Sequence, residues 1–157
     1  MRTQEVLIVV RRGGEFLVVH RSPENDAYWH LIAGGVEEAE TFTEAAVREL
    51  QEETGLDTPV EPLDVSFTYK TVHVECFITE APAAWEPKLD WEHDEYRWCS
   101  ADEAAGLFRW PEPAEIVQDL GTRATTGSPV PRPTCRQATG KTVTSPSQLR
   151  ADSRTDR

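Results

Sequence analysis

The chain has 157 residues, of which 38% are hydrophobic, 28 are acidic and 16 are basic. This length allows one domain with its own core and excludes two ordinary ones. The charge is divided, because 26 acidic and 9 basic residues precede Gly121, whereas 2 acidic and 7 basic residues follow from there on. An acidic domain repels a nucleic acid backbone, so the domain is not expected to bind nucleic acid.

The three cysteines are scattered through the chain at Cys76, Cys99 and Cys135. They are too few for a disulfide framework and lack the CxxC spacing of zinc sites, so we expect ordinary reduced thiols. The chain opens into a strand-like run without a signal sequence, and no apolar stretch approaches membrane-spanning length. We therefore expect a cytoplasmic protein with no membrane partner.

Apolar, β-branched runs predict a hairpin near the start of the chain. Residues 5–11 and 15–20 are two such runs, and Arg12-Gly13-Gly14 between them supplies a glycine turn. A polar loop follows over 21–26, and a brief strand over 29–32 leads into the glycines at 34 and 35.

The clearest helix is expected directly after this region. Thr41-Phe42-Thr43-Glu44 has the form of a capping box, the next ten residues are good helix formers, and Gly55 stands where a helix ends. Further strands are predicted at 65–70, 72–79 and 95–99, and helices at 101–108 and 113–120. Strands mixed with helices, without a regular βαβ repeat, indicate an α/β domain around a mixed sheet.

Residues 121–157 have a different composition from the rest. They hold 12 Ser and Thr, 4 Pro and hardly any large apolar side chain. Such a segment buries too little surface to offset the entropy of ordering, so we expect one domain over 1–120 and a disordered basic tail over 121–157. The tail is either an adaptor for RNA or an acidic partner, or an unselected extension.

The predicted helix carries an acidic strip. Glu49, Glu52 and Glu53 fall within an arc of about 100° on a helical wheel, so their carboxylates converge. Three close negative charges are unfavourable without a cation, and hard oxygen ligands select Mg²⁺ or Mn²⁺. Arg48 lies four residues from Glu52 and can fix a carboxylate there while supplying a compensating charge.

The residues before the helix are suited to a phosphate. Gly34 and Gly35 allow the backbone to approach a polyphosphate closely, as residues with a Cβ would not. Arg21, at the end of the second strand, is a candidate contact for substrate phosphate, with a surface ion pair as the alternative.

The spacing of these residues resembles the signature of the Nudix hydrolases. Gly34, five residues, Glu40, seven residues and then residues 48–56 (RELQEETGL) match every specified position of that family's box. The resemblance implies an α/β/α sandwich and hydrolysis of a nucleoside diphosphate linked to another group. It also implies Glu52 and Glu53 as metal ligands, Glu49 as ligand or base, and Arg48 as the partner that orients it.

The resemblance suggests further residues of the site. Nudix relatives often place a catalytic carboxylate in a loop before a later strand, and Glu92 is our candidate there, with a solvated loop as the alternative. Glu40, a fixed position of the box, joins the glycines as a candidate for substrate binding. Ala39 stands where many members of the family carry Gly, and a left-handed backbone there would cost about 1–2 kcal/mol.

The flanking residues look most like the dihydroneopterin triphosphate pyrophosphatase branch of the family. The resemblance is carried by Tyr28-Trp29, by residues 34–41, by Glu92-His93 and by Tyr96-Arg97-Trp98. It implies a nucleoside triphosphate-like substrate and Mg²⁺, with Mn²⁺ as an alternative. Diadenosine polyphosphate hydrolysis and nucleotide sensing without turnover remain open as other functions, and a homodimer remains open as the assembly.

Overall fold

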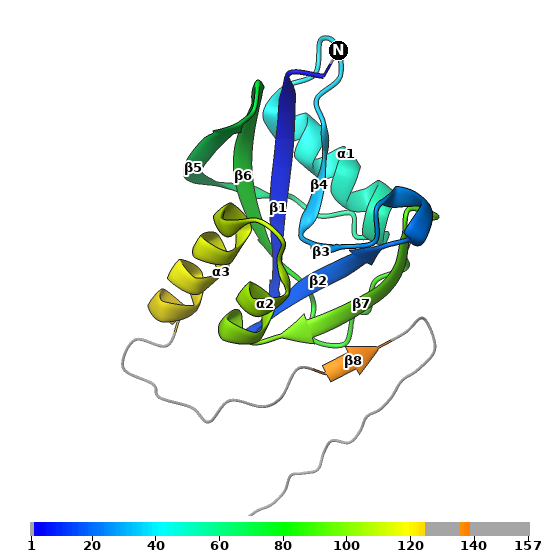
Figure 1. Ribbon diagram of the computed structural model, residues 1–157, viewed down its shortest axis with the longest axis vertical. Coiled ribbons are helices and arrows are strands. Elements are labelled where there is room, and N and C mark those ends of the chain that lie inside the picture. The colour runs from blue at the N-terminus through cyan, green and yellow to red at the C-terminus, as the bar shows by residue number, and fades with distance from the viewer. Residues whose placement is uncertain (1, 125–135, 139–157) are drawn as a thin grey trace, which may run out of the picture.

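The computed structural model describes residues 2–124 and 136–138. One sheet runs through the molecule, with helices on both of its faces (Figure 1). In chain order the elements are β1 (Gln4–Arg12), β2 (Glu15–Arg21), the 3-10 turn η1 (Pro23–Asn25), β3 (Trp29–His30), β4 (Ile32–Gly35), α1 (Phe42–Thr54), β5 (Glu61–Tyr69), β6 (Val72–Glu80), β7 (His93–Cys99), α2 (Ala101–Leu107), α3 (Pro111–Ala124) and β8 (Arg136–Ala138).

The sheet is mixed and β1 is at its centre. The strand order is β5-β6-β1-β2-β7-β8, with β4 paired to β1 and β3 paired to β2. β1 and β6 run parallel, and the other pairs are antiparallel. β1 pairs with β6 on one edge, whereas on the other edge it pairs with β4 near its start and with β2 near its end. The sheet therefore splits along that second edge, where the chain passes from β4 toward α1.

Alternate residues of β1 enter two separate cores. Val6, Ile8 and Val10 pack with Ala45, Ala46 and Leu50 of α1. Leu7 and Val9 pack on the other face with residues of α2 and α3, among them Ala104, Ile116 and Val117. A central strand covered on both faces reads as a continuous apolar run, as the sequence EVLIVVR does. These two layers of helices confirm the expected α/β/α sandwich.

The start and end of α1 are fixed locally. The Thr41 hydroxyl accepts from the Glu44 backbone N–H at 3.0 Å, and the Glu44 carboxylate accepts from the Thr41 N–H at 3.0 Å. Gly55 ends the helix with a φ of 83°, a left-handed conformation that glycine adopts without strain. The predicted capping box is therefore confirmed.

Several elements differ in extent from the expected ones. β5 begins at Glu61 rather than Val65, because an edge strand with an irregular register between Pro62 and Ser66 still pairs with β6. The glycines 34 and 35 belong to β4, where they pair with Val6 and Glu5. α3 starts at Pro111, which suits a first helical position.

The expected tail lies mostly outside the described residues. Within it, α3 continues to Ala124, and β8 pairs antiparallel with β7. Cys76 is free and buried, but Cys99 is disulfide-bonded, so the expectation of reduced thiols is wrong for Cys99. Cys135 lies outside the described residues.

Among the described residues, no helix has both the length and the apolar character needed to cross a membrane.

Candidate active site

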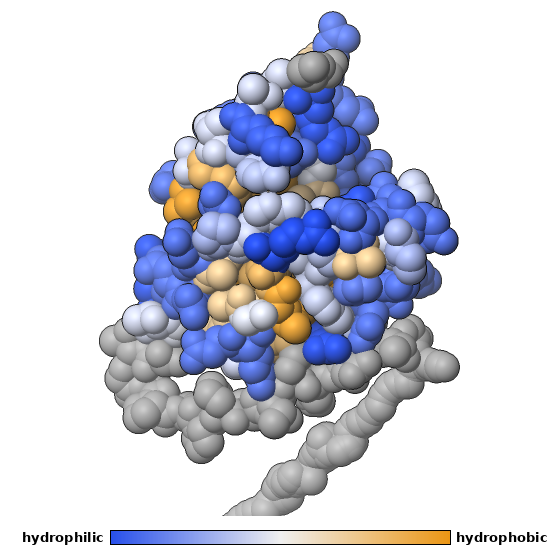
Figure 2. Space-filling model, viewed as in Figure 1, coloured by the Kyte–Doolittle hydropathy of each residue, from blue (hydrophilic) through white to orange (hydrophobic). Residues whose placement is uncertain are grey.

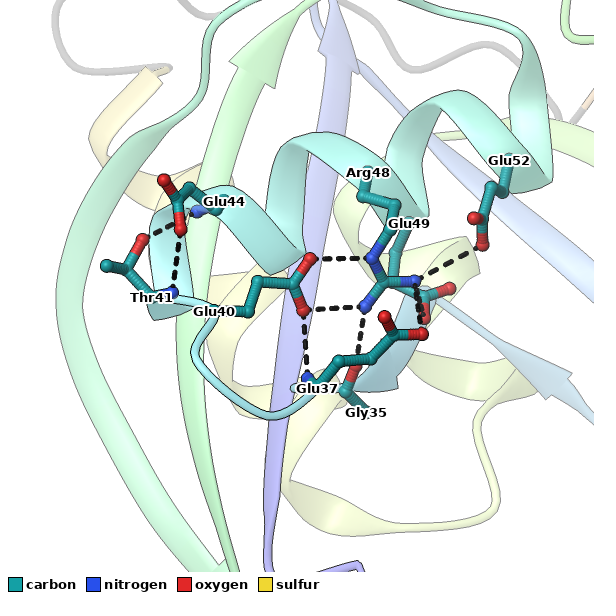
Figure 3. A network of polar contacts seen from close by, with 8 residues as sticks. All are labelled: Gly35, Glu37, Glu40, Thr41, Glu44, Arg48, Glu49 and Glu52. Atoms are coloured by element: carbon teal, nitrogen blue, oxygen red, sulfur yellow. Dashed lines mark hydrogen bonds and ion pairs between the residues drawn. The ribbon is translucent and has the colours of Figure 1, made fainter.

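Arg48 is the centre of a polar network on the exposed side of α1 (Figure 3). Its Nε and one terminal nitrogen donate to the two Glu40 oxygens at 2.7 and 2.9 Å, which is a bidentate pair. It also donates to the Gly35 carbonyl at 2.9 Å, to Glu49 at 3.0 Å and to Glu52 at 3.3 Å. One guanidinium therefore joins the loop before α1, the end of β4 and the helix itself.

Glu40 is the closest partner of Arg48. Hydrogen bonding from Arg48 lowers the pKa of Glu40 to about 2, with a further contribution from the Glu37 backbone N–H. Hydrogen bonds to Glu40 and Glu49 raise the pKa of Arg48 above its ordinary value, so the Glu40–Arg48 pair stays charged. Both oxygens of Glu40 already accept hydrogen bonds within the protein. The role of Glu40 as a substrate ligand therefore stays a prediction.

Glu49 lies directly under Gly34. A Cβ added to Gly34 would collide with the Glu49 carboxylate, so this glycine is required by close approach of a side chain. Burial raises the pKa of Glu49, while hydrogen bonds from Glu53 and Arg48 act in the opposite direction. The box glycine and the box glutamate thus form one packed unit.

Glu53 is buried with only 4% of its surface exposed. Its Oε1 atom has no hydrogen-bond partner, and its carboxyl group donates a hydrogen bond to Glu49. Burial raises the pKa of Glu53 strongly, and the negative charges of Glu49, Asp90 and Glu92 raise it further. A buried carboxyl with a free oxygen among other acids is unfavourable without a cation.

The segment before β7 brings more acidic and imidazole groups to Glu53. His93 is buried, with Nδ1 2.9 Å from Asp90 and Nε2 3.9 Å from the free Oε1 atom of Glu53. Glu92 is half-buried and held by its backbone, since its carbonyl accepts from the Ser22 N–H at 2.9 Å. The negative charge of Glu92 contributes to the raised pKa of Glu53, so the two side chains lie near each other. Their separation of 39 positions in the sequence gives no sign of this.

Glu52 departs from the expected strip. Its side chain is 58% exposed and turns toward Arg48, while Glu49 and Glu53 face each other. Among the described residues, no three His, Cys, Asp or Glu side chains are already gathered as a metal site. The donor set nevertheless fits a hard divalent cation, because it consists of carboxylate oxygens and includes the unpartnered Glu53 Oε1.

Of the other predicted residues, Gly35 belongs to the network through its carbonyl oxygen, whereas Arg21 lies beside it. Gly35 packs against Arg2, and Arg21 donates to the Asn25 carbonyl at 3.0 Å while lying 5.6 Å from the Tyr28 ring. Ala39 has a φ of 67°, so the left-handed conformation considered from the sequence is present.

A cavity of about 180 Å³ opens on the opposite face of β1. Figure 2 views the molecule from this face, where apolar patches alternate with hydrophilic ones. The rings of Tyr28 and Trp110 meet at 4.9 Å, and Tyr69 lies 5.8 Å from Trp110. Other lining residues include Glu5, His30, Phe67 and Glu112.

His30 gives this cavity a polar interior. Its Nδ1 atom is buried without a hydrogen-bond partner. Burial lowers the pKa of His30 to about 4, with a smaller contribution from Arg21, so the ring is neutral at neutral pH. An unpartnered, neutral imidazole nitrogen is available to a ligand.

Sequence reasoning missed three features of this region. The Glu40–Arg48 pair spans eight residues and depends on the loop before α1, so helical spacing does not reveal it. Asp90 was overlooked beside the more prominent acidic run that follows it. The cavity brings together Tyr28 and Trp110, which are 82 positions apart in the sequence. Their aromatic character is the only signal in the sequence that points to this contact.

Comparisons with known proteins give a consistent family. The family model described as NUDIX domain matches residues 1–120. The chain is 34% identical over 121 residues to an octanoyltransferase of Myxococcus xanthus, covering 71% of this chain but only 33% of that protein. It is 30% identical over 132 residues to the dihydroneopterin triphosphate diphosphatase of Escherichia coli K12, covering 72% of this chain and 87% of that protein.

A solved structure agrees on the fold. The Escherichia coli dihydroneopterin triphosphate pyrophosphohydrolase aligns with a TM-score of 0.67 at 21% identity, covering 76% of this chain and 95% of that chain. At this identity the likeness bears on the fold alone.

Proposed function

This chain belongs to the Nudix family of hydrolases, which act on pyrophosphate bonds, and we propose that it is a Mg²⁺-dependent pyrophosphohydrolase of a nucleoside triphosphate-like substrate. The observation that carries this proposal is the Glu53 carboxyl, buried beside Glu49 with one oxygen unpartnered and with the charges of Asp90 and Glu92 nearby. Such an arrangement destabilises the metal-free protein, whereas a bound cation would be coordinated by these carboxylates and would compensate their charge.

Glu49 and Glu53 are the residues we propose to hold Mg²⁺, with Glu52 reaching the same ion after turning from Arg48. Nudix hydrolases use divalent metal ions, and the small, oxygen-preferring Mg²⁺ suits carboxylates together with substrate phosphates. When bound, the ion would neutralise phosphate charge and favour attack by water on phosphorus.

Arg48 would hold the acidic helix α1 in a fixed position relative to the segment that precedes it (residues 34–41), which we expect to bind phosphate. Its bidentate bond to Glu40 and its bond to the Gly35 carbonyl fix the distance between α1 and β4. The charge on Arg48 also compensates part of the acidic cluster when no substrate is present.

Glu92 is the residue we propose to accept a proton from the attacking water. Its backbone carbonyl accepts from the N–H of Ser22, the residue directly after β2, and its half-buried side chain lies near enough to Glu53 to raise the pKa of that group. A general base must be within hydrogen-bond reach of the water it activates, and a fixed loop backbone limits where that carboxylate can lie.

The cavity lined by Tyr28, Trp110 and His30 is the proposed site for the substrate's ring. Its volume is on the scale of one bicyclic heterocycle, its walls are aromatic, and the His30 Nδ1 can hydrogen-bond to a ring edge. Glu5, which lines it, pairs in the sheet with Gly35, whose carbonyl binds Arg48. One strand therefore separates the ring site from the phosphate site.

A second candidate is hydrolysis of diadenosine polyphosphates. It is favoured by Trp91, which is 76% exposed beside Glu92 and could stack on a second base. A substrate with a single base would bind in the cavity and make no use of Trp91.

The test is phosphate or pyrophosphate release, with Mg²⁺ or with EDTA, from dihydroneopterin triphosphate, nucleoside triphosphates, diadenosine tetraphosphate and ADP-ribose. We expect Mg²⁺-dependent turnover of a triphosphate. Glu53→Gln should lose most of it, whereas Glu38→Gln, an exposed carboxylate in the neighbouring loop, should keep it. Preference for the dinucleotide, reduced by Trp91→Ala, would select the second candidate. Nucleotide binding without any turnover would select a sensor.

A further inference from the structure

The β6–β7 loop (residues 81–92) carries the proposed base, and backbone hydrogen bonds fasten it to other parts of the protein at separate points. The Ala81 N–H donates to the Arg11 carbonyl at 2.8 Å, and the Lys88 N–H donates to the Thr54 carbonyl at 2.8 Å. Thr54 follows Glu53 in α1, so the loop is fastened next to the buried carboxyl. These contacts leave the segment around Glu86 to be held by side chains.

Glu86 is the side chain that holds this segment. Its Oε1 accepts from the Tyr96 hydroxyl at 3.1 Å and from the Trp98 Nε1–H at 3.0 Å. Its Oε2 accepts from Arg12 at 3.1 Å. One carboxylate thus ties the loop to β1 and to β7.

The donors to Glu86 have little access to water. Trp98 is 2% exposed and Tyr96 is 4% exposed. The Arg12 guanidinium lies 3.9 Å from the centre of the Trp98 ring and also donates to the Trp85 carbonyl. Removing the acceptor would leave buried donors unpaired, which is costlier than losing an exposed ion pair.

We propose that Glu86 is a positioning residue, which holds the β6–β7 loop so that Asp90 and Glu92 face Glu53. It does not touch the reacting atoms. Asp90 follows it by four positions, and the Lys88 hydrogen bond to α1 lies between them. A shift of this loop would move Glu92 away from the phosphate site without changing the cavity that we assign to the ring. This inference rests on the proposed function.

The variant Glu86→Ala should therefore lower kcat by about tenfold to a hundredfold, since displacement of a catalytic group by about 1 Å can cost a hundredfold, with KM changed far less. Glu86→Gln should restore most of the turnover, because its amide oxygen still accepts from Tyr96 and Trp98. Glu80→Ala is the matched control: Glu80 pairs with Arg11 at a similar exposure and holds no loop, so turnover should be unchanged.

A double-mutant cycle separates positioning from general damage to the fold. If Glu86 acts through Glu92, Glu86→Ala should cost little more in a Glu92→Gln background. Full additivity of the two losses would overturn the proposal.

Hydrogen exchange tests the same inference without activity. We expect Glu86→Ala to remove protection from the Lys88 amide, and Glu86→Gln to keep it. An equally protected Lys88 amide in both variants would refute the positioning role. If the wild-type protein hydrolyses no substrate, the proposed function fails, whereas the exchange result still decides whether Glu86 holds the loop.

Discussion

The substitution Glu53→Gln should stabilise the metal-free protein at neutral pH. Glu53 is buried, and burial with neighbouring acids raises its pKa from an ordinary value of 4.5 to above neutrality. The folded state therefore keeps a proton that the unfolded chain releases. The contribution of Glu53 to the free energy of unfolding is therefore fully present below the pKa that Glu53 has in the unfolded chain. It is lost as the pH rises from there toward the pKa that Glu53 has in the folded protein.

The size of this effect follows from the pH interval. Each pH unit between 4.5 and 7 costs about 1.4 kcal/mol, so the loss at pH 7 is about 3 kcal/mol. Glutamine cannot titrate, and its amide can donate to Glu49 as the protonated carboxyl does. For a domain of this size we expect the Tm at pH 7 to rise by roughly 5–10 °C.

The assay is thermal unfolding in EDTA at pH 4.5 and pH 7, for the wild type, Glu53→Gln and Glu52→Gln. The exposed Glu52 is the matched control and should shift the stability by no more than about 0.5 kcal/mol. Mg²⁺ should then raise the Tm of the wild type but not that of Glu53→Gln. A Glu53→Gln variant that melts at or below the wild type at pH 7 in EDTA would refute the reasoning.

Three further substitutions test the phosphate side of the site. Gly34→Ala should displace the Glu49 carboxylate, lowering turnover at least tenfold and the free energy of unfolding by about 1–3 kcal/mol, as kinetics and urea titration would show. Ala39→Gly should instead raise the free energy of unfolding by about 1 kcal/mol, because it relieves the positive φ; an unchanged value would mean that Ala39 is unstrained. Arg48→Lys keeps the charge but not the bidentate fork to Glu40, so kcat should fall about tenfold, and full activity would exclude an orienting role.

Local chemistry explains why much of the fold was predictable. The capping box at Thr41, the glycine after Thr54 and the turn at Gly13 act within a few residues, and each is present as expected. β5 was harder, because residues 61–64 combine Pro62 with a positive φ at Asp64, and only pairing with β6 makes them a strand.

The site was predictable as a set of residues but not as a set of contacts. Helical spacing places Glu49, Glu52 and Glu53 on one strip, yet it does not show that Arg48 draws Glu52 aside while Glu53 turns inward. That division depends on the β6–β7 loop, which brings Asp90 and other acids to α1 from far along the chain. Tertiary electrostatics of this kind leave no periodic trace in a sequence.

The place of β1 in the sheet also bears on how the chain folds. β1 is made early, yet its parallel partner β6 begins only at Val72, and the other face of its apolar run is covered by helices that come still later. During synthesis the segment Val6–Val10 therefore lacks its β6 partner until more than half of the domain has been made. Such a strand is prone to pair with another chain, so a chaperone that shields nascent apolar strands should improve the yield of folded protein.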